Sequence, residues 1–223
     1  MTKRKTNKLV TSAMLIALGT AVSLVCEFIP FLNLPFGGTI TFASLLPLVI
    51  IGYLYGPGWG FGSAFVYAIL QMAVGFRTVG ALFTPGSDSF MGIGVAFGVV
   101  LLDYLLAFTS VGISSLFRGI RRPAGAIVLG AAAGLLACYF FHTVSGMIFY
   151  GAWAEWFFTE TVFGELAVGK WILERFSGFG LAAVYSLVYN GCYMIPEILI
   201  TMVCGAALAS VPQIQEGREE KKK

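Results

Sequence analysis

The sequence predicts an all-α integral membrane protein, a bundle of six transmembrane helices with both termini in the cytoplasm. Composition is the first reason: of 223 residues, 58% are hydrophobic and only 11% are charged, a balance that soluble globular domains do not have. The second is a set of six apolar runs of about the length that crosses a hydrocarbon core, which takes about twenty residues. The third is the gathering of basic residues in alternate connections between these runs.

The six expected spans are residues 9–28, 39–55, 61–76, 91–117, 124–150 and 178–211. The second and third are short and separated only by GPGWG, so they form either a hairpin of two spans or one re-entrant unit. The first follows a basic start but is too long for the apolar region of a signal peptide and has no clear cleavage site. No soluble segment of any size is left, so we expect residues 1–223 to form a single transmembrane domain.

The basic residues give the orientation. Eleven of the fourteen lie on one side of a six-span topology: Lys3, Arg4, Lys5, Lys8, Arg118, Arg121, Arg122, Arg218 and Lys221 to Lys223. Only Arg77, Lys170 and Arg175 fall on the other side. The positive-inside rule therefore places both termini in the cytoplasm. The net charge of +3 reflects this topology and gives no reason to expect nucleic-acid binding.

The four cysteines all lie in apolar runs, without a CxxC pair or a Cys/His cluster at metal spacing. We expect them to be small buried hydrophobes and predict neither a metal nor a cofactor.

Three polar side chains lie deep inside expected spans: Asp103 in GVVLLDYLLAF, His142 in LLACYFFHTVSGMIFYG and Asn190 in AAVYSLVYNGCYMIP. A charged residue at the centre of a transmembrane helix costs about 3 kcal/mol on insertion scales, so such groups face the protein interior and commonly mark a substrate or ion path. A structural alternative is that Asp103 pairs with His142 to hold two helices together, and that Asn190 hydrogen-bonds between helices.

Aromatic and polar residues recur near these three positions. Tyr104 follows Asp103, Tyr67 and Gln71 lie one turn apart, and Gly146 and Tyr150 share a helix face with His142. Tyr185, Tyr189 and Tyr193 repeat every four residues beside Asn190. A carboxylate among aromatic rings suits a cation, and the imidazole and amide suit a ligand with ring nitrogens. The pattern predicts a pocket in the outer half of the membrane for a flat, cationic, hydrogen-bonding solute.

Some residues near this pattern are expected to be structural. We expect Tyr193 to serve packing and interface anchoring, Glu197 to contact a neighbouring helix or partner, and Glu27 to lie at the outer surface. Residues 151–177 are aromatic and acidic. They predict either a short interfacial helix over 161–176 or a lid over an outward-facing site.

Ala13, Ala17 and Ala21 recur every four residues on one face of the first span. Small residues at this spacing allow close approach of another helix. That helix belongs either to the same bundle or to a second protein.

The segments SAMLIALGTAVSLV, GGTITFASLLPLVIIGYLYGPGWGFGSAFVYAILQ, LLDYLLAF, HTVSGMIFYG and YSLVYNGCYMIPE, in this order and spacing, resemble the thiamine-specific S component of energy-coupling factor (ECF) transporters. The resemblance implies a six-helix subunit of a bacterial cell membrane that captures thiamine from outside with high affinity. It also implies docking onto a transmembrane coupling subunit bound to two cytoplasmic ATPases, through the stripe Ala13, Ala17 and Ala21.

The resemblance implies substrate contacts at Tyr67, Asp103, Tyr104, His142, Tyr150, Tyr185 and Asn190. Asp103 stands where the family often has glutamate, and Tyr67 and Tyr150 stand where it has tryptophan. An aromatic residue of the first loop, Phe31 or Phe36, is expected to join them.

Two other function classes compete with a binding subunit. A stand-alone proton-coupled secondary transporter could use Asp103 and His142 as a proton relay, although the sequence shows no inverted repeat or pair of broken helices. An intramembrane enzyme is disfavoured because no nucleophile accompanies the lone histidine. The chain has no Walker motif, so ATP hydrolysis would have to come from a partner.

Overall fold

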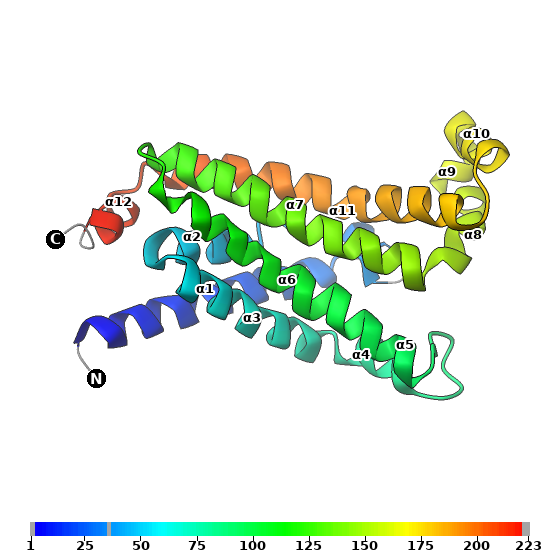
Figure 1. The fold of residues 1–223 in the computed structure, drawn as a ribbon, viewed down its shortest axis with the longest axis horizontal. Helices are drawn as coiled ribbons and strands as arrows, with labels where there is room; N and C mark the ends of the chain where they lie inside the picture. The colour runs from blue at the N-terminus through cyan, green and yellow to red at the C-terminus, as the bar shows by residue number, and fades with distance from the viewer. Residues whose placement is uncertain (1–2, 35–36, 220–223) are drawn as a thin grey trace.

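The computed structural model describes residues 3–34 and 37–219, and it is an elongated helical bundle (Figure 1). The all-α prediction is confirmed: these residues contain no strand, only one isolated bridge between Asn33 and Thr39. The start of α1 and the C-terminal α12 lie at one end of the bundle, and α8, α9 and α10 lie at the other (Figure 1).

The helices, in chain order, are α1 (Lys3–Glu27), α2 (Leu46–Tyr55), α3 (Pro57–Val74), α4 (Phe76–Phe83), α5 (Ile93–Val99), α6 (Ala107–Ser110), α7 (Pro123–Phe149), α8 (Ala154–Glu160), α9 (Val162–Glu165), α10 (Ala167–Arg175), α11 (Gly178–Leu208) and α12 (Pro212–Glu219). Shorter or differently wound segments join them: η1 (Pro30–Leu32), the π-helical η3 (Val100–Leu106), the 3-10 helix η4 (Val111–Gly119) and η5 (Gly151–Trp153).

Four helical segments of the described chain are long and apolar enough to cross a membrane: Lys5–Glu27, Ile93–Gly119, Pro123–Phe149 and Gly178–Leu208. A fifth arises if α3 and α4, which are bent by 74° at Gly75, form one span. The remaining apolar helix, α2, has ten residues. The multi-pass architecture is thus confirmed, whereas the count of six spans and the cytoplasmic position of the termini stay predictions.

The second expected span, 39–55, is helical only from Leu46 onward. Its first seven residues are non-helical and contribute to the wall of an internal cavity. Non-helical backbone at membrane depth is tolerated where it is buried in protein or lines a cavity, because its polar groups must find partners there. The helix expected in this span therefore begins seven residues later than the span, and the bounds of the span itself stay a prediction.

Glu197 of α11 supplies the partners that this segment needs. Its side chain is 2% exposed, and its carboxylate accepts hydrogen bonds from the Thr41 hydroxyl (2.7 Å) and from the backbone N–H groups of Ala43 (3.1 Å) and Leu45 (3.0 Å). These groups precede the first turn of α2, where unsatisfied N–H groups and the helix dipole favour an anion. Of the two roles expected for Glu197, the structure shows the contact within the bundle.

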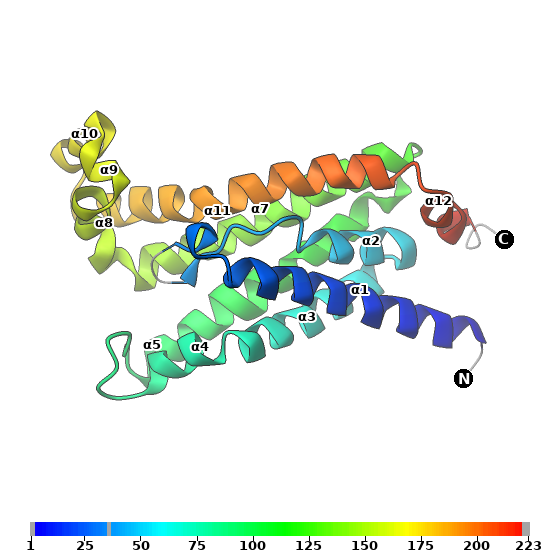
Figure 2. The same ribbon diagram turned by 180° about the vertical axis from the view of Figure 1, so that it is seen from behind.

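Small residues bring the central helices close together. The α7 helix packs along α11 and against η4 (Figures 1 and 2). A side chain added at Gly130 or Gly134 would collide with the backbone of η4, and one added at Gly146 would collide with Ser186 of α11. Such close approach replaces the hydrophobic effect as the source of helix association inside a bilayer.

The start of α1 and α12 lie at the same end of the bundle (Figure 2), and two arginines bind backbone carbonyl groups of other segments near α12. The Arg118 guanidinium donates to the Tyr53 carbonyl (3.2 Å) at the C-terminus of α2, where a positive charge is favourable. Arg218 of α12 donates to the Ile120 carbonyl (2.8 Å). Positive charge thus gathers at one end, as the topology argument requires.

Residues 151–177 form three short helices, α8 to α10, in place of the single helix expected over 161–176. Phe157 and Phe158 of α8 are buried, and Phe157 packs edge-on to Tyr185 of α11 at 5.3 Å between ring centroids. This segment therefore packs, through α8, against the aromatic side chain of Tyr185 on α11.

We predict that Glu197→Gln destabilises the bundle. Both oxygens of the carboxylate accept hydrogen bonds here, whereas a glutamine amide has an NH₂ donor in place of one oxygen. At least one buried donor would then lack an acceptor, at a cost of about 1–3 kcal/mol. The apparent unfolding temperature in detergent should fall by about 5 °C, as measured by intrinsic fluorescence. Glu174→Gln, at an exposed position of α10, is the matched control, and equal stability of the two variants would contradict the prediction.

Candidate functional site

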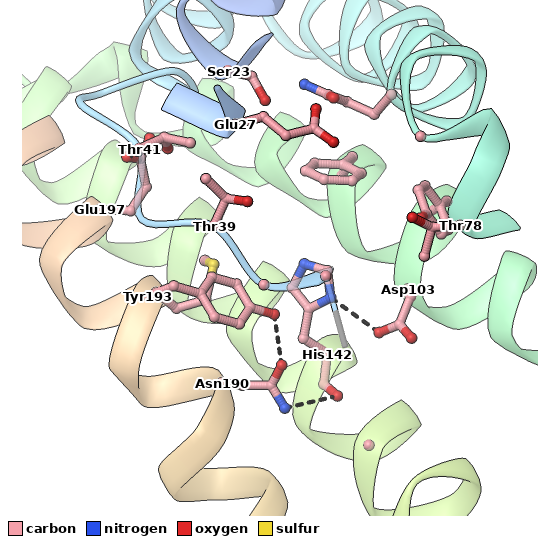
Figure 3. A pocket seen from close by; sticks show the side chains of 18 of the residues that line it. Ser23, Glu27, Thr39, Thr41, Thr78, Asp103, His142, Asn190, Tyr193 and Glu197 are labelled. Atoms are coloured by element: carbon pink, nitrogen blue, oxygen red, sulfur yellow. Dashed lines mark hydrogen bonds and ion pairs between the residues drawn. The ribbon is translucent and has the colours of Figure 1, made fainter. Parts of the chain in front are cut away.

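A cavity of about 450 Å³ lies inside the bundle, within the usual size range of small-molecule sites. Its walls come from the end of α1, the following loop, α3 to α6, η3, α7 and α11. Figure 3 shows polar side chains entering this space from several of these elements.

The residues predicted as substrate contacts come together here. All seven line the cavity: Tyr67, Asp103, Tyr104, His142, Tyr150, Tyr185 and Asn190. They come from α3, η3, α7, α11 and the residue that follows α7. Their contact with a ligand stays a prediction.

Asp103 is held by two residues of α7. Its Oδ1 lies 3.0 Å from Nδ1 of His142, and its Oδ2 accepts a hydrogen bond of 2.8 Å from the Ser145 hydroxyl (Figure 3 shows the former). The structural alternative foreseen for this residue, pairing with His142 across two helices, is therefore present. The pair also faces the cavity, with 19% of the Asp103 side chain exposed, so pairing and ligand binding are compatible.

A π-helical segment places Asp103 and Tyr104. Residues 100–106 form η3 between the α-helical turns of α5 and α6. A π-bulge inserts an extra residue per turn, rotates the side chains that follow, and is frequent at functional sites. Both side chains consequently reach the cavity from one helix.

Asn190 has its amide fixed on both sides. Its Nδ2 donates to the Ser186 carbonyl (2.8 Å) and to the His142 carbonyl (3.3 Å), and its Oδ1 accepts from the Tyr193 hydroxyl (2.6 Å); Figure 3 shows the bonds with His142 and Tyr193. These bonds link α7 to α11 at the level of His142. They also set the orientation of the Tyr193 ring at the cavity wall.

Tyr193 packs against two buried clusters, as expected, but packing is not its whole position. Its half-buried ring lines the cavity and lies edge-on to His142 at 5.9 Å between centroids. Tyr189, one turn earlier, also lines the cavity, and its hydroxyl accepts a hydrogen bond from the Gly38 N–H (3.2 Å). The four-residue repeat of tyrosines in this span was the signal that could have assigned all three to one wall.

The other expectations have mixed outcomes. Glu27 is exposed, as expected for a residue at the surface, but its side chain also lines the cavity, which was not expected. Phe31 is 83% exposed and is not among the lining residues, whereas Phe36 lies outside the described residues. In the described chain no group of three or more His, Cys, Asp or Glu side chains is placed to hold a metal ion.

The alanine stripe on α1 lies on the surface of the bundle. Ala13, Ala17 and Ala21 are all exposed, together with the neighbouring Met14 and Leu18. The stripe therefore does not serve close packing within this chain. Contact with another helix through it stays a prediction.

A membrane-embedded bundle with an aromatic-lined cavity and a hydrogen-bonded carboxylate is the architecture of a small-solute-binding membrane protein. Comparison with known families agrees: the model of the thiamine transporter protein family (Thia_YuaJ) matches residues 13–173. The chain therefore belongs to this family of multi-pass bacterial membrane proteins.

Individual relatives are distant but cover most of the chain. The thiamine transporter ThiT of Bacillus subtilis is 26% identical over 200 residues, 84% of either chain. ThiT of Lacticaseibacillus paracasei is 24% identical over 189 residues, 80% of this chain and 77% of the relative. The solved structure of ThiT from Listeria monocytogenes superposes with a TM-score of 0.63 at 20% identity, covering 95% of this chain and 98% of that one, which shows the shared fold.

Proposed function

We propose that this chain is the high-affinity thiamine-binding subunit of an ATP-driven vitamin importer of the ECF type, with the whole chain acting as one substrate-binding domain. The observation that carries the proposal is a carboxylate, Asp103, at the wall of an aromatic cavity inside a membrane bundle. Membership of the thiamine transporter protein family, and relatives named as thiamine transporters, support thiamine as the ligand.

The charge of thiamine suits Asp103. The thiazolium ring carries a permanent positive charge, and a cation close to the carboxylate favours its ionised form. The hydrogen bonds from Ser145 and His142 leave Asp103 partly exposed to the cavity. The substrate would thus complete the compensation of a charge that is costly at this depth.

The flat rings of thiamine suit the remaining walls. Tyr185 and Tyr189 lie with centroids 5.6 Å apart and planes tilted by 38°, and Tyr104 and Tyr150 line the same cavity. Faces of such rings attract cations and stack on heterocycles. The amide of Asn190 and the imidazole of His142 supply hydrogen-bonding groups for the aminopyrimidine.

Coupling to ATP would come from other subunits. The chain carries no Walker motif, and its small-residue stripe on α1 is exposed. We assign this stripe to contact with the transmembrane coupling subunit, which in turn binds two cytoplasmic ATPases. Small side chains permit the close helix contact that such docking in a bilayer needs.

One observation favours a different class of transporter. The Asp103–His142 pair joins two titratable groups at 3.0 Å, as a proton relay in a stand-alone secondary transporter would. Uptake of labelled thiamine into liposomes that contain only this chain, driven by a pH gradient, separates the two. The proposal expects no accumulation above that of protein-free liposomes, and gradient-dependent accumulation would reject it.

Asp103→Asn should abolish high-affinity binding of thiamine by the purified chain. Loss of a buried, hydrogen-bonded charge that faces a ligand cation costs about 2–5 kcal/mol, so affinity should fall by about thirtyfold to several thousandfold. Calorimetric titration measures the change. Glu160→Gln, at an exposed position of α8 that lines neither the cavity nor a neighbouring hollow, should bind nearly as the unmodified chain does. Equal affinities of Asp103→Asn and the unmodified chain would overturn the assigned site.

Ala17→Leu should separate binding from transport. The larger side chain disturbs the exposed stripe on α1 without reaching the cavity, so thiamine titration should be unchanged while ATP-dependent uptake by the assembled transporter falls. Ala206→Leu, at an exposed alanine of α11, controls for added bulk on the lipid-facing surface. Unimpaired uptake by Ala17→Leu would remove the stripe from the proposed interface.

A further inference from the structure

The cavity is lined by three carboxylate side chains and, within the described chain, by no lysine or arginine. Asp103 and Glu197 are both engaged, the first by His142 and Ser145 and the second by Thr41 and the segment before α2. The third is Glu27, the last residue of α1. Among the residues described here, none donates a hydrogen bond to the Glu27 carboxylate or forms an ion pair with it.

Glu27 lies on the opposite side of the cavity from the residues that hold Asp103. Figure 3 shows its carboxylate projecting from α1 into the space that His142 and Asp103 face from the other side. Its backbone carbonyl is separately occupied, accepting a hydrogen bond from the Asn33 amide (2.7 Å). The side chain is therefore free to act on a ligand while the backbone fixes the start of the loop.

The position of Glu27 corresponds to the opening of the cavity. The lining residues that are exposed, Glu27, Asn33, Gly37 and Thr78, lie at the end of α1, in the following loop and on α4, whereas Tyr67 and Gln71 deeper inside are buried. A second hollow adjoins the first and shares four lining residues with it: Gly37, Thr78, Leu82 and Tyr150. A solute that enters between α1 and α4 would pass the unpaired carboxylate.

We propose that Glu27 is a specificity-determining residue that favours the free cationic vitamin over its phosphate esters. The inference rests on the proposed function and adds a discriminating group to the same site. A cavity with low-dielectric walls and an excess of carboxylates concentrates the field. The one imidazole among its lining residues, His142, is already paired with Asp103, so the unpaired carboxylate of Glu27 attracts the thiazolium and repels a phosphate. Specificity arises here from a repulsive contact against the wrong ligand as much as from attraction to the right one.

The main feature opposing this proposal is Arg77. Its side chain lines the adjoining outer hollow together with Asp88, and a guanidinium is a good phosphate ligand. It belongs to the outer hollow and is not among the residues that line the inner cavity. If Arg77 held the phosphate of an ester, the ester would bind as well as thiamine and Glu27 would not control the ratio.

The test is a calorimetric comparison of thiamine and thiamine monophosphate binding to the purified full chain, Glu27→Gln and Glu27→Lys. The expected result is graded: the ratio of the two affinities falls about tenfold on neutralisation and further on charge reversal. Glu155→Gln, at an exposed position of α8 that does not line the cavity, should keep the ratio of the unmodified chain.

The outcomes separate the two levels of the proposal. Absence of thiamine binding by the unmodified chain would reject the proposed function itself. Normal thiamine binding with an unchanged affinity ratio in both Glu27 variants would reject only the role of Glu27. An equal loss for both ligands would also reject it, because a residue that merely supports the loop weakens every ligand alike.

Discussion

The constraint on which the rest of the site depends is the presence of a carboxylate inside the membrane part of the bundle. Asp103 is tolerated because Ser145 and His142 reach it from α7. This arrangement requires α7 and the segment 100–106 to lie close together and the helix to carry a π-turn at that point. Charge compensation and helix packing are therefore one structural feature here.

The charge of Glu197 is also compensated by hydrogen bonds, but from a different part of the chain. It too is a buried acid, but its partners are the N–H groups and the hydroxyl that precede α2. Because these satisfy its carboxylate, the residue holds the non-helical segment against α11. That segment then exposes Gly38 and Thr39 to the cavity. One buried acid thus shapes the wall, and the other is left partly exposed to the ligand space.

Sequence patterns predicted most of this architecture because the bilayer constrains both the length of the apolar runs and the side on which basic residues lie. The bounds of α7, expected as 124–150 and found as Pro123–Phe149, follow from hydropathy alone. The start of α2 could not be predicted this way, since residues 39–45 are apolar enough to resemble a span while their conformation depends on Glu197, more than 150 residues away. Apolar composition says that a segment is buried, not whether its backbone is paired within a helix.

The candidate site shows the same division. Asp103, His142 and Asn190 stand out because polar groups in apolar runs are costly, and the tyrosine repeat marks a face. The same repeat indicates that Tyr193 shares this face, whereas its hydrogen bond to Asn190, which orients its ring, is encoded by no spacing rule. Glu27 gave no signal at all: an acid at a span end is ordinary at a membrane surface. Only the fold, which turns the end of α1 toward the cavity, distinguishes a surface charge from one that lines the cavity. In this multi-pass protein, the sequence therefore identifies the polar residues that are costly to bury. The tertiary structure is needed to identify exposed charged residues, such as Glu27, that also line the cavity.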